Sequence, residues 1–150
     1  IFDVGCEYNN YVSDIGRTFP VSGTFTPRQK EILEMEVGIA NQIIAFLKPG
    51  ITFKDIRNLT DSIIPVEAKK YMQVGLFFGH HLGLSTGDPD LPEAVLKPGM
   101  IFTVEPWYYN HDEQISVFTE DVILITETGC EVLSKDLVRA PGDLERLMKF

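Results

Sequence analysis

The sequence has little cysteine, little positive charge and no long apolar run, and each absence excludes a class of protein. Its two cysteines, Cys6 and Cys130, lie far apart and form neither a CxxC pair nor a disulfide framework. The 13 basic residues face 22 acidic ones, and the net charge of −9 excludes a generic basic surface for nucleic acid. No apolar run approaches the ~20 residues of a membrane-spanning helix. We therefore expect neither nucleic acid nor a membrane as a partner.

The composition that remains is that of a globular protein. The 150 residues are 44% hydrophobic and 23% charged. We find no linker, repeat or low-complexity tract, so we expect one domain over residues 1–150. No basic region precedes an apolar stretch as in a secretory signal, and we expect a cytoplasmic protein. The opening segment, residues 1–5, does not begin with Met and has the pattern of a strand, which indicates a piece of a longer protein.

The predicted elements run in the order hairpin, two helices, further strands. Thr26, Pro27 and Gln29 form a capping-box pattern at the start of the first helix, and a second helix starts near Thr52. Since strands do not alternate regularly with helices, we expect an α+β fold with an antiparallel sheet and helices on one face. The predicted ranges are strands over 1–4, 10–21, 100–105 and 117–126, helices over 27–47 and 52–64, and a short helix from about 142.

Four acidic residues lie inside or at the ends of apolar strands: Asp3, Asp14, Glu105 and Glu120. A buried carboxylate costs free energy unless it is paired or bound to a metal ion. Arg17 is the only base near Asp3 and Asp14 in the sequence, and Glu120 has no Lys or Arg within ten residues. Each acid taken alone could face water at a sheet edge or form a salt bridge. Together, with so few bases nearby, they favour bound cations.

A candidate imidazole ligand, His80, lies in the segment Gly79-His80-His81-Leu82-Gly83-Leu84. Taken alone, such a histidine pair is also compatible with an ordinary surface or core position. Carboxylates plus one imidazole suit Mn, Co, Zn or Fe(II). Four carboxylates balance the charge of two divalent ions, which together activate a water molecule as nucleophile. The pattern is compatible with a dinuclear metal site.

Six segments, in order and over nearly the whole chain, resemble the pita-bread metallopeptidases, in the branch of aminopeptidase P and prolidase. The resemblance implies the pita-bread fold, a curved antiparallel sheet with helices on its outer face. It also implies an incomplete catalytic domain, without the amino-terminal domain and the first part of the catalytic one. The matching segments are residues 2–5, 13–20, 79–84, 96–100, 103–106 and 119–121.

The resemblance also implies the ligands and the reaction. Asp14 and Glu120 would bridge two metal ions, Asp3 would serve the first, and His80 and Glu105 the second. Glu105 would also take a proton from the water that bridges the two ions. The implied reaction removes the amino-terminal residue of a peptide substrate, here one followed by proline. We expect two divalent ions, manganese first, with cobalt or zinc as alternatives.

Three positions depart from the family pattern: Leu76 and Gly87 stand where histidine is usual, and Phe118 where arginine is usual. His81, Asp88 or His111 could compensate. We place His81, Gly87 and Phe118 in the substrate pocket as an expectation. The departures leave two alternatives open, which are a non-peptide C–N or C–S substrate at the same site and a weakly active or inactive member with a binding role. Exposed sheet edges in an incomplete domain would favour association, for example as a homodimer.

Overall fold

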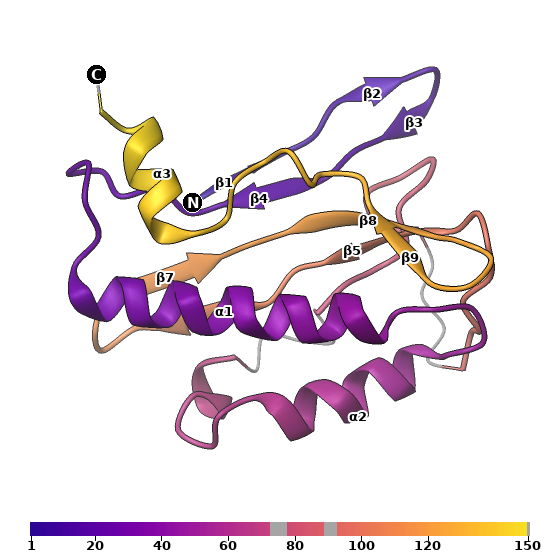
Figure 1. Cartoon of the computed structure of the whole chain (residues 1–150), viewed down its shortest axis with the longest axis horizontal. Helices are drawn as coiled ribbons and strands as arrows, with labels where there is room; N and C mark the ends of the chain where they lie inside the picture. Colours follow the sequence, from indigo (N-terminus) through magenta and orange to yellow (C-terminus); the bar gives the residue numbers. More distant parts are fainter. Residues whose placement is uncertain (73–77, 89–92, 150) are drawn as a thin grey trace.

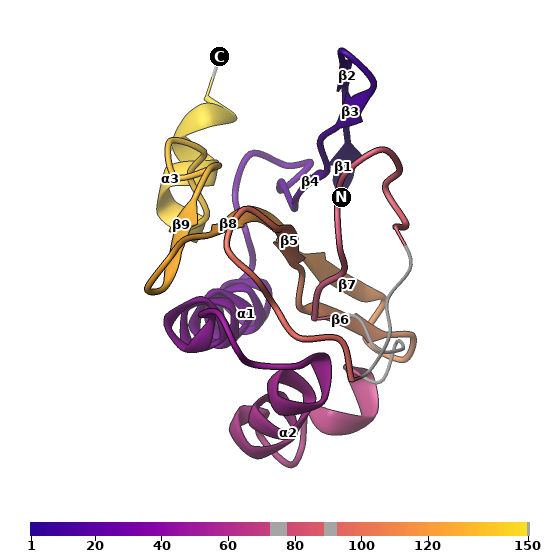
Figure 2. The ribbon, with the colours of Figure 1, turned by 90° about the vertical axis from the view of Figure 1, so that its right-hand side faces the viewer.

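The computed structural model describes residues 1–72, 78–88 and 93–149. Two layers are visible in Figures 1 and 2. The long helix α1 (Pro27–Phe46) and the shorter α2 (Phe53–Ile63) lie on one side of the central strands, and the hairpin of β2 (Glu7–Tyr8) and β3 (Tyr11–Val12) extends away from them. The elements are β1 (Phe2–Val4), β2 (Glu7–Tyr8), β3 (Tyr11–Val12), β4 (Ile15–Arg17), α1 (Pro27–Phe46), α2 (Phe53–Ile63), the 3-10 turn η1 (Lys69–Tyr71), β5 (Ile101–Val104), β6 (Trp107–Asn110), β7 (Ile115–Phe118), β8 (Asp121–Ile125), β9 (Cys130–Val132) and α3 (Pro141–Leu147).

Both long helices begin with a capping box. At α1 the Thr26 hydroxyl accepts from the backbone N–H of Gln29, and the Gln29 side chain accepts from the backbone N–H of Thr26. Thr52 and Asp55 make the same pair of bonds at α2. These bonds satisfy backbone donors that have no partner inside a helix. The helix starts predicted from the sequence are confirmed, as is the short carboxyl-terminal helix.

The strands pair antiparallel, in the order β5-β8-β9 and in the pairs β6-β7, β1-β4 and β2-β3. The α+β fold class is therefore confirmed. The single strand predicted over 117–126 is wrong, because the chain breaks at Thr119 and Glu120 between β7 and β8. At the break the Glu120 N–H donates to the carbonyl of Gly16 in β4, 2.9 Å away. The strand predicted over 10–21 is likewise split, and β6 and β9 were not predicted.

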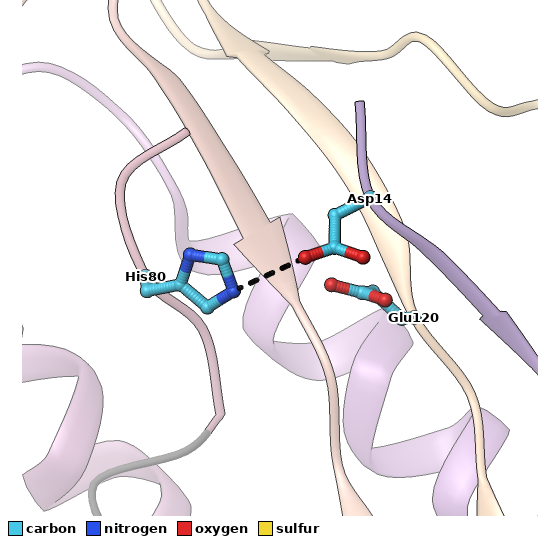
Figure 3. A group of neighbouring side chains, drawn as sticks. All are labelled: Asp14, His80 and Glu120. Carbon is cyan, nitrogen blue, oxygen red and sulfur yellow. Dashed lines mark ion pairs between the residues drawn. The ribbon is translucent and has the colours of Figure 1, made fainter. Parts of the chain in front are cut away.

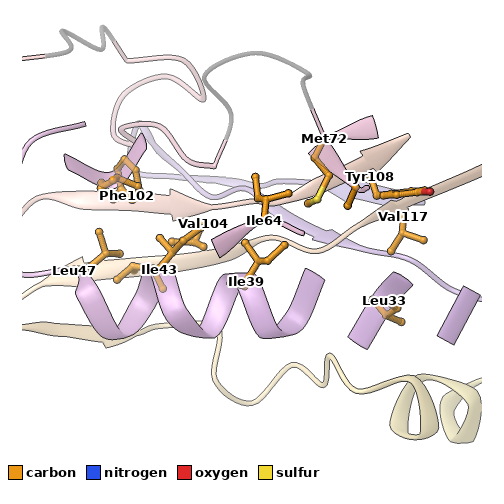
Figure 4. Packing of buried hydrophobic residues seen from close by; sticks show 14 of the residues in the cluster. Leu33, Ile39, Ile43, Leu47, Ile64, Met72, Phe102, Val104, Tyr108 and Val117 are labelled. Carbon is orange, nitrogen blue, oxygen red and sulfur yellow. The ribbon is translucent and has the colours of Figure 1, made fainter. Parts of the chain in front are cut away.

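The core lies between α1 and the central strands, as Figure 4 shows. Phe102 and Val104 of β5 are fully buried in it, together with Leu33, Ile39 and Ile43 of α1. Because side chains alternate along a strand, residues 103 and 105 face the other way. The core therefore fixes β5 so that Thr103 and Glu105 lie on the face away from α1.

An exposed edge is present at β1, which pairs only with β4 in the part of the chain that is described. Phe2 and Val4 are exposed there, and so are Tyr8 and Tyr11 in the neighbouring hairpin. Homodimer formation through this edge stays a prediction. None of the helices in the described ranges is long and apolar enough to cross a membrane.

Glu36 is a carboxylic acid inside this core. It lies on α1 with 0% of its surface exposed, and neither carboxyl oxygen has a hydrogen-bond partner among the described residues. Burial raises the pKa of Glu36 well above its usual 4.5. The nearby backbone of Tyr108 lowers this pKa, but by less than burial raises it. Because the folded state keeps this proton, the contribution of Glu36 to stability is fully present below pH 4.5 and is lost as the pH rises through the raised pKa.

We predict that Glu36→Met raises the free energy of unfolding by about 1–3 kcal/mol at neutral pH, since it removes an unsatisfied buried polar group. The gain over wild type should be larger at pH 9 than at pH 5. Urea unfolding of both proteins in EDTA at the two pH values measures it, and Glu36→Gln is the control that cannot ionise. A difference between Glu36→Met and wild type that does not change with pH would show that Glu36 is not the titrating group.

Candidate metal centre

Asp14, His80 and Glu120 meet on the face of the sheet away from α1. Asp14 lies between β3 and β4, His80 in the segment before β5, and Glu120 in the break between β7 and β8. Each offers one ligand atom, and these atoms lie within 4.8 Å of one another. Figure 3 shows the three side chains pointing toward one another, with His80 Nε2 3.9 Å from Asp14 Oδ2. Three segments far apart in the sequence thus form one cluster.

Two further predicted residues lie beside this cluster. Glu105, directly after β5, places Oε1 3.2 Å from His80 Nε2. Asp3 is exposed on β1, and its charge raises the pKa of Asp14, Glu105 and Glu120, so it lies in the same electrostatic neighbourhood. Four of the five residues that the resemblance implied as ligands therefore lie together, and the charge of the fifth, Asp3, acts on three of them.

The orientation of His80 is set by its backbone surroundings. Its Nδ1 lies 3.0 Å from the carbonyl oxygen of His81, which can only accept, so we assign the ring proton to Nδ1. The backbone N–H of His80 donates to Thr103 Oγ1, and the N–H of Thr103 donates to the carbonyl of His80. The lone pair on Nε2 is left facing the carboxylates, as a metal ligand requires.

The carboxyl groups of Asp14, Glu105 and Glu120 have pKa values above their usual ones. Burial, followed by repulsion from Asp3, raises the pKa of Asp14. Burial also raises the pKa of Glu105 to about 7, against the attraction of His80 and with repulsion from Asp14 and Asp3. For Glu120, burial and then the charges of Glu105, Asp14 and Asp3 raise the pKa to about 9. The centre holds more negative charge than its protein surroundings neutralise.

Glu120 shows whether a cation fits. The residue is 1% exposed, and neither of its carboxyl oxygens has a hydrogen-bond partner among the described residues. A buried carboxylate without a partner is costly, and a coordinated metal ion removes that cost. Carboxylate oxygens with one imidazole nitrogen are a donor set for Mn, Co, Zn or Fe(II). The residues present therefore fit divalent cations.

Arg17, the one base near Asp3 and Asp14 in the sequence, does not pair with either of them. Its guanidinium forms an ion pair with Asp121 at 2.8 Å, on the opposite face of the strands. Its charge lowers the pKa of Glu120, but less than burial and the other carboxylates raise it. The ion pair of Asp121 with Arg17 was not predicted from the sequence. Only the position of Asp121 next to Glu120 could have drawn attention to it.

Phe118, one of the predicted pocket positions, is buried on the same side as Glu120. Its ring lies 5.6 Å from that of Trp107, the residue directly opposite in the β6–β7 register. It also covers Gly16, where a Cβ would come within 2.0 Å of the Phe118 ring. Trp107 was not predicted, although it follows Glu105 by two residues. The two rings form an aromatic wall on the face of the strands that carries Asp14, because the Phe118 ring lies over Gly16, two residues after Asp14.

The other predicted pocket positions lie elsewhere. The ring of His81 packs against Phe53 at the start of α2 at 5.1 Å and against Phe102 of β5 at 6.0 Å. Gly87 is exposed in the loop after His80, with open space where a side chain would be. Leu76 lies outside the described residues. A pocket role for His81 and Gly87 stays a prediction.

Comparison with known proteins decides the family. The model of metallopeptidase family M24 matches residues 1–127. The chain belongs to this family. The M24 chain is 31% identical to the Xaa-Pro aminopeptidase of Escherichia coli over 180 residues, which covers 99% of the chain and 40% of that relative.

Two solved structures place the M24 chain in the aminopeptidase P branch and confirm the pita-bread fold. Proline aminopeptidase P II of Yersinia pestis has a TM-score of 0.86 at 30% identity, covering 97% of this chain and 40% of that one. Zinc-substituted aminopeptidase P of E. coli, in complex with product, has a TM-score of 0.84 at 30% identity, with the same coverage. The M24 chain therefore spans about 40% of the length of these relatives.

Proposed function

We propose that this chain carries the metal centre of an exopeptidase that removes the amino-terminal residue from peptides with proline in second position. The names of the relatives, Xaa-Pro aminopeptidase and aminopeptidase P, support this substrate class. The observation that carries the proposal is the cluster of Asp14, His80 and Glu120, in which the buried carboxyl of Glu120 has no hydrogen-bond partner among the residues that the structure describes. We expect the reaction to take place in the cytoplasm.

The five neighbouring residues would hold two divalent ions, manganese first and cobalt or zinc as alternatives. Asp14 and Glu120 would be shared between the ions, with Asp3 on one and His80 and Glu105 on the other. When bound, such ions lower the pKa of water and polarise a carbonyl group. Glu105 would accept the proton of the attacking water, as the family resemblance implies, and its Oε1 lies 3.2 Å from His80 Nε2. Thr103 Oγ1, 3.4 Å from Glu105 Oε1, orients that carboxyl.

A second candidate keeps this centre but acts on another C–N or C–S substrate. The wall of Trp107 and Phe118 favours it, since two apolar rings pack together where the family usually has an arginine at the position of Phe118. An apolar wall binds an apolar or aromatic group better than a charged one.

The test combines elemental analysis of the purified protein with hydrolysis assays in added MnCl₂. A series of Xaa-Pro peptides is compared with matched Xaa-Ala peptides and with small non-peptide amides. Release of the first residue from Xaa-Pro peptides alone supports the first candidate, and turnover of the amides alone supports the second. Bound metal without any hydrolysis would contradict both and favour a binding role.

Metal removal should destabilise the protein. Bound cations neutralise the repulsion among Asp14, Glu105 and Glu120, so binding favours the folded state. With free Mn²⁺ at 100 times its dissociation constant, the free energy of unfolding should rise by about 2.7 kcal/mol over the protein in EDTA. Thermal unfolding in EDTA and in MnCl₂ measures this difference, with MgCl₂ as a control for ionic strength. Equal midpoints in EDTA and MnCl₂ would contradict the metal centre.

A further inference from the structure

A second group of charged and polar side chains, buried or half-buried, lies behind Glu120 on the opposite face of the strands. It consists of Asp121, Arg17, Ser134 and Arg139, which we call the Asp121 cluster. Asp121 Oδ1 accepts from Arg17 Nη2 at 2.8 Å and from Ser134 Oγ at 2.7 Å, and Oδ2 lies 2.9 Å from Arg139 Nη1. Asp121 is 1% exposed, so its cost of burial is offset by these partners. Oδ1 thus has two hydrogen-bond partners, whereas the contact of Oδ2 with Arg139 is an ion pair without hydrogen-bond geometry.

Arg17 uses all five of its N–H groups. Nη2 donates to Asp121 and to the carbonyl of Leu137, and Nε donates to the carbonyl of Val138. Nη1 donates to the carbonyls of Gly16 and Glu120. A guanidinium offers five donors in a rigid fork, whereas an ammonium offers three from one point. No other side chain could make the same set of bonds.

Two of the bonds around Arg17 fix the main chain of Glu120. Its carbonyl accepts from Arg17, and its N–H donates to the Gly16 carbonyl that Arg17 also holds. The carboxyl of Glu120 itself has no hydrogen-bond partner in the described ranges, and it faces the like charges of Asp14 and Glu105. In the part of the chain that is described, hydrogen bonds therefore fix Glu120 only through its backbone.

We propose that Arg17 and Asp121 are positioning residues that hold Glu120 in place for metal binding. The inference rests on the metal centre proposed above. Asp121 fixes the orientation of the guanidinium, and the guanidinium fixes the peptide groups on both sides of Glu120. Loss of a group that orients a ligand typically lowers metal affinity about 10–100-fold.

Two variants separate positioning from folding. Arg17→Lys keeps the positive charge beside Asp121 but removes donors to Gly16 and Glu120, so the buried ion pair is retained while Glu120 is released. Asp121→Asn keeps the size of the side chain but removes the charge that orients Arg17. Arg28→Lys is the matched control, because Arg28 pairs with Glu113 on the surface, far from the metal centre in sequence and on another element.

The measurement is calorimetric titration of each purified, EDTA-treated protein with MnCl₂, at a temperature where circular dichroism shows the protein folded. We expect dissociation constants 10–100 times that of wild type for Arg17→Lys and Asp121→Asn, and no change for Arg28→Lys. A folded Arg17→Lys protein with wild-type affinity would overturn the inference, even if its unfolding temperature were lower. A wild-type protein that binds no Mn²⁺ would overturn the metal centre and the inference together.

Discussion

Replacing Asp14 with asparagine should remove the bound metal and with it any hydrolysis. Asp14 contributes a ligand atom to the cluster, lies 3.9 Å from His80, and would be shared between two ions. Asparagine has the same shape but no charge, so the variant tests the electrostatic role of the side chain. Because orienting groups outside the ligand set already change affinity by 10–100-fold, we expect a fall in Mn²⁺ affinity of at least about 10²-fold.

The metal-free Asp14→Asn protein should be at least as stable as metal-free wild type. Burial and the charge of Asp3 both raise the pKa of Asp14, so the carboxylate is held in an unfavourable environment until a cation binds. Elemental analysis, peptide hydrolysis and unfolding in EDTA are measured on the same preparation. Asp61→Asn, an exposed position on α2, is the matched control. Metal content and hydrolysis equal to wild type would rule out Asp14 as a ligand.

Local features of the fold could be predicted because their causes lie within a few residues. The capping boxes at Thr26 and Thr52 depend on side chains three positions away, and both helices start where the sequence indicated. Acids inside apolar strands were also visible, since few bases lie near Asp14 or Glu120 in the sequence. These observations named residues that the structure brings together, although their role as ligands stays a prediction.

Features that depend on distant partners could not be predicted. The break at Glu120 exists because β4, about one hundred residues earlier, supplies its hydrogen-bond partner. The ion pair of Arg17 and Asp121 joins residues 104 positions apart. In the sequence Arg17 is instead close to Asp3 and Asp14, with which it forms no ion pair. The orientation of the His81 ring depends on its contacts with Phe53 and Phe102. The residues next to His81 in the sequence do not indicate these contacts. Pairing between distant segments decided each of these outcomes.

Gly79→Ala should be the most damaging small substitution near the metal centre. Gly79 has φ +152°, a conformation that residues with a side chain rarely adopt. An added Cβ would come within 1.8 Å of the Thr103 carbonyl oxygen and 2.4 Å of the Phe102 ring. Neither can move without disturbing β5 in the core. Backbone strain and overpacking together should destabilise the fold by about 3–5 kcal/mol.

The same substitution should weaken metal binding in the protein that remains folded. Gly79 precedes His80, whose backbone is bonded on both sides to Thr103, so a shift at 79 moves the imidazole away from Asp14 and Glu105. Gly38→Ala is the control, with an expected effect of opposite sign. Gly38 lies inside α1, and no atom lies within 4 Å of an added Cβ, so the substitution should stabilise the folded protein by about 0.5–1 kcal/mol. Urea unfolding and Mn²⁺ titration of both variants measure the two effects. A Gly79→Ala protein with wild-type stability and affinity would mean that this backbone does not position His80.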